Sequence, residues 1–175
     1  MTRRVLVAGI GNIFLSDDGF GSEVARRLIT QVVPDGVAVV DYGIRGMHLA
    51  YDLLDGYDAL VIIDTLPHRA PPGDLVVLEI GPDDVGEGDF DAHGMEPTAV
   101  LASLGAMGGT LPPTFVIGCE PACLDEGIGL SPAVDGAVEA ALRLTRELLE
   151  TTLARVPPAA RLEAAAANQH REKES

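Results

Sequence analysis

The side chains best suited to chemistry in this sequence are acids and a histidine that follow short apolar runs. Asp17 and Asp18 follow the first such run, Asp64 ends the third, and His93 comes after the fourth. Two carboxylates and one imidazole form a mixed oxygen and nitrogen donor set with open coordination positions. Such a set suits zinc, nickel, iron or manganese better than a thiolate-bound metal. A metal held there could polarise a carbonyl group or activate water.

Each of these residues also has an ordinary structural explanation. Asp17 and Asp18 precede an expected helix, so one could cap its free N–H groups while the other faces a ligand. Asp64 could simply close the turn after a strand. His93 stands among acidic neighbours, and an exposed loop histidine is more often solvated than bound to metal. Taken singly, the residues leave both interpretations open.

The cysteines and one serine are weaker candidates for chemistry. Cys119 and Cys123 have no second pair to complete a zinc site, so we expect them to be structural. Ser131 precedes a proline at an expected helix start and is better explained as a cap, since no Gly-x-Ser-x-Gly motif surrounds it. Gly9 and Gly11 begin a dinucleotide fingerprint, but Phe14 stands at the third glycine position.

The elements that must position these residues are short valine- and isoleucine-rich runs alternating with helical patterns. This alternation predicts a three-layer α/β/α fold, with helices on both faces of a twisted, mostly parallel five-stranded sheet. Strands are expected at Val5–Ile10, Val37–Val40, Ala59–Ile63, Leu75–Ile80 and Thr114–Ile117, and helices at Gly19–Val33, Met47–Leu54, Pro97–Met107 and Pro132–Leu153.

Ligands of open α/β sheets bind beyond the carboxyl ends of the strands. We therefore expect the acids and the histidine that follow these strands to meet at one rim: Asp18, Asp41, Asp64, His93 and Glu120. This expected convergence is the strongest functional signal in the sequence.

The length of 175 residues fits a single domain, which we expect over residues 1–156. Pro157 and Pro158 begin a tail over 157–175 that is rich in alanine and then charged, and we expect it to be flexible or loosely helical. Glycines and an asparagine interrupt the apolar run that starts at Val5, so it resembles neither a membrane span nor a signal peptide. We expect a cytoplasmic monomer.

The charge balance restricts the partners. Lys and Arg number 12 and Asp and Glu number 27, which gives a net charge of −15. Nucleic acids and anionic membrane surfaces need basic partners, so both are disfavoured. A cation or a basic protein surface fits this chain better.

Several motifs, taken in order, resemble those of the hydrogenase maturation endopeptidases. The similarity covers roughly residues 4 to 150 in the family's own order. The first motif of the series is the most specific one. The later motifs support the resemblance because they occur together in the family's order. The matching segments are 5–12, 16–21, 41–43, 62–64, 92–94, 118–121 and 129–132.

This resemblance implies a function and a set of ligands. Family members clip a C-terminal extension from the large-subunit precursor of a [NiFe] hydrogenase after nickel insertion. Matching the motifs residue by residue implies that Asp18, Asp64 and His93 recognise the nickel, with zinc or another divalent ion as a possible surrogate. Departures from the family pattern, such as Thr65 after Asp64, bear on the identity of the partner hydrogenase.

The mechanism and two alternatives stay open at this point. We favour water as the attacking group, with Asp41 orienting a loop or handling protons. The first alternative is a peptidase that carries its own zinc. The second is a non-catalytic module that senses nickel or the precursor.

Overall fold

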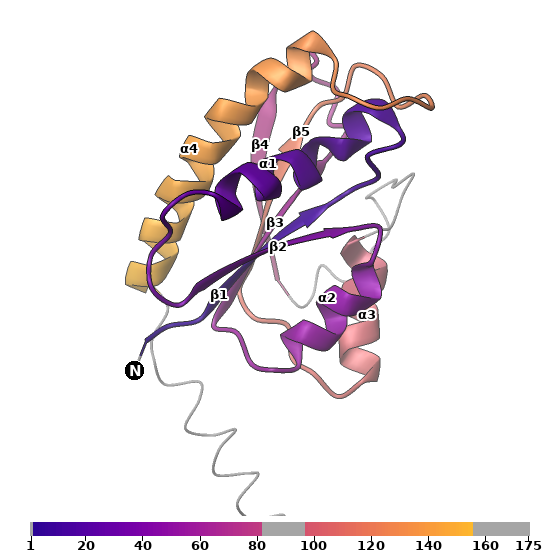
Figure 1. Ribbon diagram of the computed structural model, residues 1–175. Coiled ribbons are helices and arrows are strands. Elements are labelled where there is room, and N and C mark those ends of the chain that lie inside the picture. The colour runs from indigo at the N-terminus through magenta and orange to yellow at the C-terminus, as the bar shows by residue number, and fades with distance from the viewer. Residues whose placement is uncertain (1, 82–96, 156–175) are drawn as a thin grey trace, which may run out of the picture.

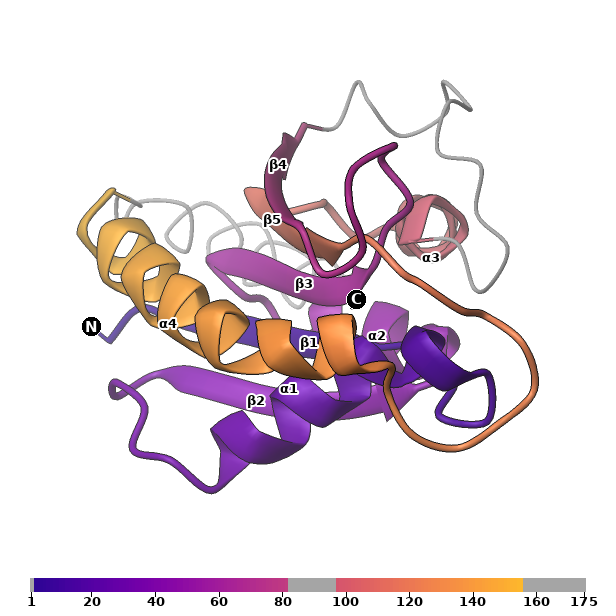
Figure 2. The same cartoon turned by 90° about the horizontal axis from the view of Figure 1, so that it is seen from above.

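The computed structural model describes residues 2–81 and 97–155, and it has a five-stranded sheet with helices on both faces (Figure 1). The strands follow one another across the sheet in the order β2-β1-β3-β5-β4, as the view from above shows (Figure 2). The strands are β1 Val5–Ile10, β2 Val37–Gly43, β3 Ala59–Thr65, β4 Leu75–Ile80 and β5 Thr114–Cys119. The helices are η1 Ser16–Gly19, α1 Phe20–Ile29, α2 Gly46–Leu53, α3 Pro97–Ala106 and α4 Pro132–Arg155. The predicted fold class is confirmed.

Most of the sheet is parallel. Strand β1 pairs in parallel with β2 and β3, and β3 pairs in parallel with β5. Their carboxyl ends therefore lie at one edge, which we call the rim. Hydrogen bonding carries β2, β3 and β5 further than their apolar runs suggest, with Asp41 opposite Gly9 and Asp64 opposite Gly118. Asp41 and Asp64 are thus the last part of their strands rather than the start of loops.

Strand β4 corrects one expectation, because it runs antiparallel to β5 and ends opposite Thr114, where β5 begins. The segment between β3 and β4 is short and contains no helix, whereas a parallel connection needs a crossover of a dozen or more residues. Strand β4 therefore starts at the rim and ends at the opposite edge. The argument that His93 follows a strand ending at the rim is wrong, and His93 itself lies outside the described residues.

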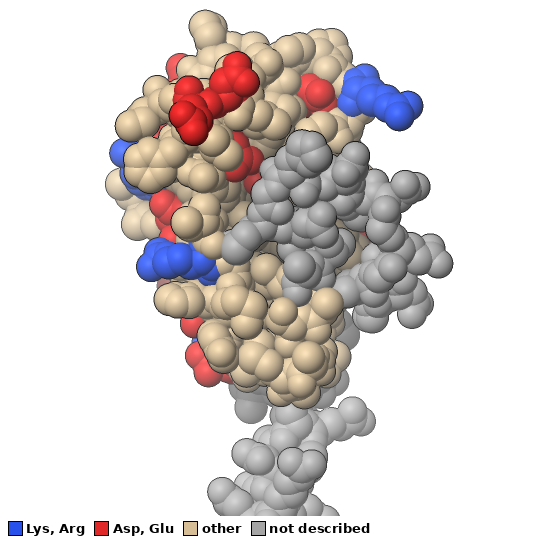
Figure 3. Space-filling view, turned by 90° about the vertical axis from the view of Figure 1, so that its right-hand side faces the viewer, with Lys and Arg blue, Asp and Glu red and all other residues tan. Residues whose placement is uncertain are grey.

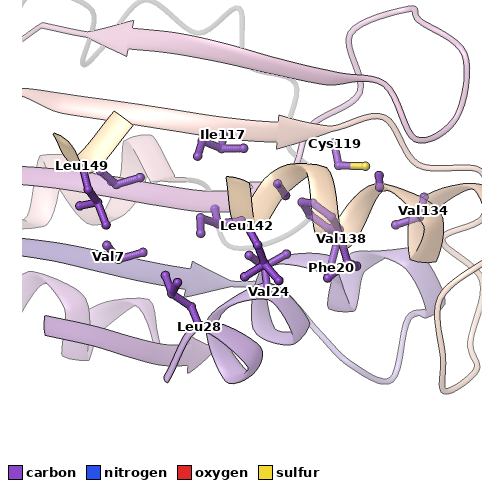
Figure 4. Close-up of a cluster of buried hydrophobic side chains, with 14 of the residues drawn as sticks. Val7, Phe20, Val24, Leu28, Ile117, Cys119, Val134, Val138, Leu142 and Leu149 are labelled. Carbon is purple, nitrogen blue, oxygen red and sulfur yellow. The ribbon is translucent and has the colours of Figure 1, made fainter. Parts of the chain in front are cut away.

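The core is divided by the sheet into two layers. Helices α1 and α4 cover one face, where Phe20, Val24 and Leu28 of α1 pack against α4 residues such as Leu142 (Figure 4). Residues spaced four apart lie on one side of a helix, which explains this buried stripe. Helices α2 and α3 cover the other face, packed over residues such as Leu6 and Leu60. Both faces of the central strands are buried, which agrees with their continuous apolar sequences.

Glycines allow α1 to begin very close to the rim. A Cβ on Gly21 would lie 2.1 Å from the carbonyl oxygen of Ile63 and 2.3 Å from that of Ile10. A Cβ on Gly9 would lie 2.5 Å from that of Ala25. The first turn of α1 therefore rests directly on the ends of β1 and β3.

The surface agrees with the acidic composition. On the face shown in Figure 3, basic side chains stand in separate places and form no continuous patch over the described residues. None of the helices in residues 2–81 and 97–155 has both the length and the apolar character needed to cross a bilayer.

Candidate functional site

Asp18 and Asp64 come together at the rim around Gly11. Asp18 lies in η1, and its Oδ2 accepts a hydrogen bond of 2.9 Å from the Asn12 N–H. Asp64 lies near the end of β3, and its Oδ1 accepts the Thr65 N–H at 2.7 Å. A Cβ on Gly11 would lie 1.9 Å from the main-chain oxygen of Asp18 and 3.9 Å from Asp64 Oδ1. Gly11, with a φ of +146°, thus makes room for both acids.

The surroundings of the two carboxylates raise the pKa of both. Burial raises the pKa of Asp18, and the Asn12 N–H offsets this only in part. The pKa of Asp64 lies well above its ordinary value, first because the group is buried and second because Asp18 is negatively charged. Neighbouring acids in such an environment favour a bound proton or cation. The pair therefore has the charge and the donor atoms expected of a divalent metal site.

The predicted third ligand lies outside this part of the chain. Among residues 2–81 and 97–155, no cluster of three or more histidine, cysteine, aspartate or glutamate side chains could hold a metal ion. Of the two histidines described, His48 is exposed on α2, and both ring nitrogens of His68 are held by Leu66 and Asp74. A role for His93 as the third ligand remains a prediction.

Asp41 supports the rim from its far side. Its Oδ1 accepts the Ser22 hydroxyl at 2.7 Å and the Gly43 N–H at 3.0 Å. The carbonyl oxygen of Gly43 in turn accepts the Gly11 N–H at 3.1 Å. Asp41 therefore links α1 to the end of β2. Through Gly43 it also links α1 to Gly11, the residue that lies beside both Asp18 and Asp64. These contacts favour the predicted loop-orienting role.

Asp17 has a different role from the helix cap that its position suggested. No side chain caps the start of α1. Asp17 is fully buried and instead accepts four hydrogen bonds, from the N–H groups of Ala122, Cys123 and Ser131 and from the Ser131 hydroxyl. Burial works to raise the pKa of Asp17, but these hydrogen bonds outweigh it and hold the pKa below its ordinary value. Asp17 is thus a stable carboxylate that binds η1 to the β5–α4 loop.

Neither Ser131 nor Cys119 is an activated nucleophile. The Ser131 hydroxyl donates to Asp17, and a carboxylate of lowered pKa is a weak general base. Cys119 is buried in the core, and burial, followed by the charges of Asp17, Glu120 and Asp74, raises its pKa to about 12. A thiol that stays protonated is a poor nucleophile. The burial and raised pKa of Cys119 favour its predicted structural role. Water stays our preferred attacking group.

Sequence reasoning missed the contacts that hold η1 in place. The Thr65 hydroxyl donates to the main-chain oxygen of Asp17 at 2.7 Å, which ties η1 to the end of β3. In the sequence, Thr65 stands out only as a departure from the family pattern. The partners of Asp17 are mostly backbone N–H groups more than a hundred residues away, and such donors leave no signature in side-chain types.

Comparison with known proteins identifies relatives of this chain. A model of the family described as hydrogenase maturation protease matches residues 22–147. The hydrogenase expression/formation protein HupD of Rhodobacter capsulatus is 34% identical over 152 residues, which cover 83% of this chain and 71% of that protein. The hydrogenase 2 maturation protease of Escherichia coli K12 is 30% identical over 152 residues, covering 79% of this chain and 86% of that protein.

Solved structures agree with these relatives. The hydrogenase maturating endopeptidase HybD from E. coli superposes with a TM-score of 0.71 at 28% identity, covering 85% of this chain and 93% of that one. The hydrogenase 2 maturation peptidase from Thaumarchaeota archaeon SCGC_AB-539-E09 has a TM-score of 0.67 at 33% identity, covering 85% of this chain and 99% of that one. Sequence and fold thus agree that the chain belongs to the hydrogenase maturation protease family and is a hydrolase that acts on a peptide bond.

Proposed function

We propose that this enzyme removes the C-terminal extension of a [NiFe] hydrogenase large-subunit precursor after nickel insertion. In this proposal Asp18, Asp64 and His93 recognise the nickel that the precursor carries. The metal is part of the substrate, so the acids need not hold a resident ion between turnovers. Membership of the hydrogenase maturation protease family supports the class of reaction.

The observation that carries the proposal is the pairing of Asp18 and Asp64 at the rim. Burial raises the pKa of both groups, and the charge of Asp18 raises that of Asp64 further, so a bound cation would relieve an unfavourable state. Carboxylate oxygens are also suitable ligands for a divalent first-row metal. The two acids could therefore bind a metal cation that the substrate carries.

The surroundings of the pair support a protein substrate. Large apolar side chains are exposed on the loops next to the two acids: Ile13 (49%), Phe14 (62%), Ile44 (62%) and Ile128 (81%). These loops are joined to each other and to the site, since the Gly127 N–H donates to Phe14 and the Gly11 N–H donates to Gly43. Exposed apolar groups beside a polar site are typical of surfaces that bind another macromolecule.

The chemistry follows from how the two acids would hold the substrate. Binding the precursor's nickel at Asp18 and Asp64 would fix the chain that leads away from it and place its scissile bond beside the rim. Correct placement of reactants contributes a large part of a catalysed rate. We propose that water attacks the carbonyl group, because Ser131 and Cys119 are engaged or protonated.

The decisive test is incubation of the enzyme with nickel-loaded and nickel-free precursor, read by intact mass. We expect only the nickel-loaded form to lose its extension, because the nickel-free form offers the acids no cation. Asp18→Asn keeps the side-chain volume, removes the charge and should abolish cleavage. Equal cleavage of both precursor forms by the unmodified enzyme would overturn nickel recognition while leaving the peptidase activity established.

Two additional measurements separate the alternatives. Metal analysis of the purified enzyme distinguishes a resident zinc, expected at one ion per chain, from a site that is filled by the substrate. A binding assay with nickel-loaded precursor distinguishes a peptidase from a sensor, because a sensor would bind the precursor and leave its mass unchanged.

A further inference from the structure

Asp17 has more polar contacts than its neighbour Asp18, yet it faces away from the proposed metal site. Its Oδ2 accepts the N–H groups of Ala122 at 2.8 Å and Cys123 at 2.9 Å, and the Ser131 hydroxyl at 2.9 Å. Its Oδ1 accepts the Ser131 N–H at 2.6 Å. With both oxygens engaged and the side chain fully buried, Asp17 is not available to substrate.

The backbone around Asp17 strengthens the same connection. The Asp17 N–H donates to Cys123 at 3.1 Å, and the Ser16 N–H donates to Gly127 at 2.9 Å. The Gly127 N–H donates back to Phe14 at 2.9 Å. Figures 1 and 2 both show the β5–α4 loop lying alongside η1. The loop has no regular secondary structure of its own between Cys119 and Pro132, so its path depends on these bonds.

We propose that Asp17 is a positioning residue, which fixes Asp18 for its ligand by anchoring η1 to the β5–α4 loop. The proposal rests on the proposed function, because it assumes that Asp18 meets the substrate's metal. The two residues are consecutive in a four-residue helix, so a rotation of Asp17 out of its site would move Asp18 as well. The Asn12 N–H marks the correct position of Asp18, since it donates to Asp18 Oδ2.

An asparagine cannot reproduce the contacts of Asp17. Every group that points at the carboxylate is a donor, and a carboxylate accepts on both oxygens. The amide of Asn would have to direct its own N–H donors at either the Ser131 N–H or the Ala122 and Cys123 N–H groups. Asp17→Asn should therefore loosen the anchor with almost no change in side-chain volume.

The experiment compares Asp17→Asn with Ser131→Ala, which removes only the hydroxyl, and with Ser16→Ala as the matched control. Ser16 donates its hydroxyl to Asp125, so this control removes a bond between the same two segments without touching the Asp17 carboxylate. Three quantities are measured on the full chain: exchange of the Asn12 amide hydrogen, affinity for Ni²⁺ in solution, and kcat and KM for nickel-loaded precursor.

We expect Asp17→Asn to speed exchange of the Asn12 amide and to lower kcat/KM and any measurable Ni²⁺ affinity by about 10- to 100-fold, as for residues that orient metal ligands. Ser131→Ala should cause a smaller loss of the same kind. Ser16→Ala should cause the smallest loss, because it removes one exposed neutral hydrogen bond between the two segments and leaves every contact of the Asp17 carboxylate in place. If Asp17→Asn does not fold, Ser131→Ala decides the matter alone.

Two results would overturn the positioning role. One is a folded Asp17→Asn or Ser131→Ala enzyme with unchanged Asn12 exchange and unchanged kcat/KM. The other is a loss in Ser16→Ala as large as that in Asp17→Asn. Failure of the proposed function is recognised separately, since Asp18→Asn would then cleave normally while the Asn12 amide still reports on Asp17.

Discussion

At the scale of single residues, the negative charge of the Asp64 carboxylate lowers the stability of the fold. Its pKa is raised by burial and by Asp18, so ionising it costs folding free energy once the pH exceeds the unfolded-state value of about 3.9. The proposed recognition of nickel needs the ionised form, because a protonated acid is a poor metal ligand. Residues that bind substrate often lower the stability of the free enzyme in this way.

Replacing Asp64 therefore should stabilise the metal-free protein. We expect Asp64→Asn to increase the free energy of unfolding at pH 7 and to abolish precursor cleavage. The gain should shrink at pH 4, where the Asp64 carboxyl of the unmodified protein is protonated in the folded state. Urea unfolding at both pH values measures it. A variant less stable than the unmodified protein at pH 7 would show that the Asp64 charge is well compensated.

Residue types and order placed Asp41 and Asp64 near strand ends, because acids that directly follow apolar runs stand there. Asp18 was placed at the rim by the motif that follows the first strand, and it lies in η1. The buried anchor at Asp17 could not be predicted in this way. Its carboxylate looks no different in sequence from that of Asp18, and only the folded chain brings the N–H groups of Ala122, Cys123 and Ser131 to it.

At the scale of elements, a histidine joins the β3–β4 connection to the end of β5. His68 Nδ1 lies 2.7 Å from the Leu66 carbonyl oxygen, and Nε2 lies 2.9 Å from an oxygen of Asp74. Both partners only accept, so the ring needs a proton on each nitrogen. The main-chain N–H of His68 donates to Glu120. The Leu66 carbonyl oxygen first and Asp74 second raise the pKa of His68.

This contact predicts a pH-dependent contribution to stability. A histidine whose folded pKa exceeds the unfolded value of about 6.5 stabilises the fold fully below that value, and the contribution is lost as the pH rises through the folded pKa. We expect His68→Gln to be less stable than the unmodified protein at pH 5.5 and closer to it at pH 9, measured by urea unfolding. His48→Gln, at an exposed position on α2, is the control. A constant difference across this range would show that His68 is held in its neutral form.

The close contact between the first turn of α1 and the ends of β1 and β3 leads to a second prediction at this scale. Gly21→Ala would push a methyl group into the carbonyl oxygens of Ile63 and Ile10, and we expect a loss of about 3 kcal/mol in the free energy of unfolding. Gly136→Ala in α4 is the matched control, because no atom lies within 4 Å of its added methyl group. That change should stabilise the protein by about 0.5–1 kcal/mol. Similar effects of the two changes would contradict the close contact.

Element types were predictable from the sequence, and element ends and directions were less so. Alternating apolar runs and helical stripes identified all five strands and the four long helices in the described part of the chain. The last residues of β2 and β3, which follow Asp41 and Asp64, were missed, because backbone pairing across the sheet extends strands beyond their apolar residues. The antiparallel direction of β4 was missed because a parallel and an antiparallel strand can have the same amino-acid composition. The two directions differ only in the geometry of the connection that leads into the strand.

At the scale of the whole molecule, the residues that form the core lie on the two faces of the sheet, whereas the candidate site lies at one edge. Helices on both faces bury the central strands, and the rim lies at the edge where β1, β2, β3 and β5 end. Rim residues can therefore change without emptying the core. This arrangement is why we expect Asp18→Asn to fold normally while losing activity, a combination that circular dichroism and the cleavage assay can establish together.

The bonds at Asp17 have a consequence for the order in which the protein forms. Its partners lie 105 to 114 residues further along the chain, so the anchor can close only after β5 and the start of α4 have been synthesised and docked. Contacts across such separations form late, since the entropy of closing the loop must first be offset. Loosening the anchor should then speed unfolding and leave the folding rate almost unchanged. Under the proposed function, a nascent chain that has already built β1, β2 and β3 still lacks a fixed Asp18, and it becomes competent to meet its substrate only after Ser131 has been synthesised.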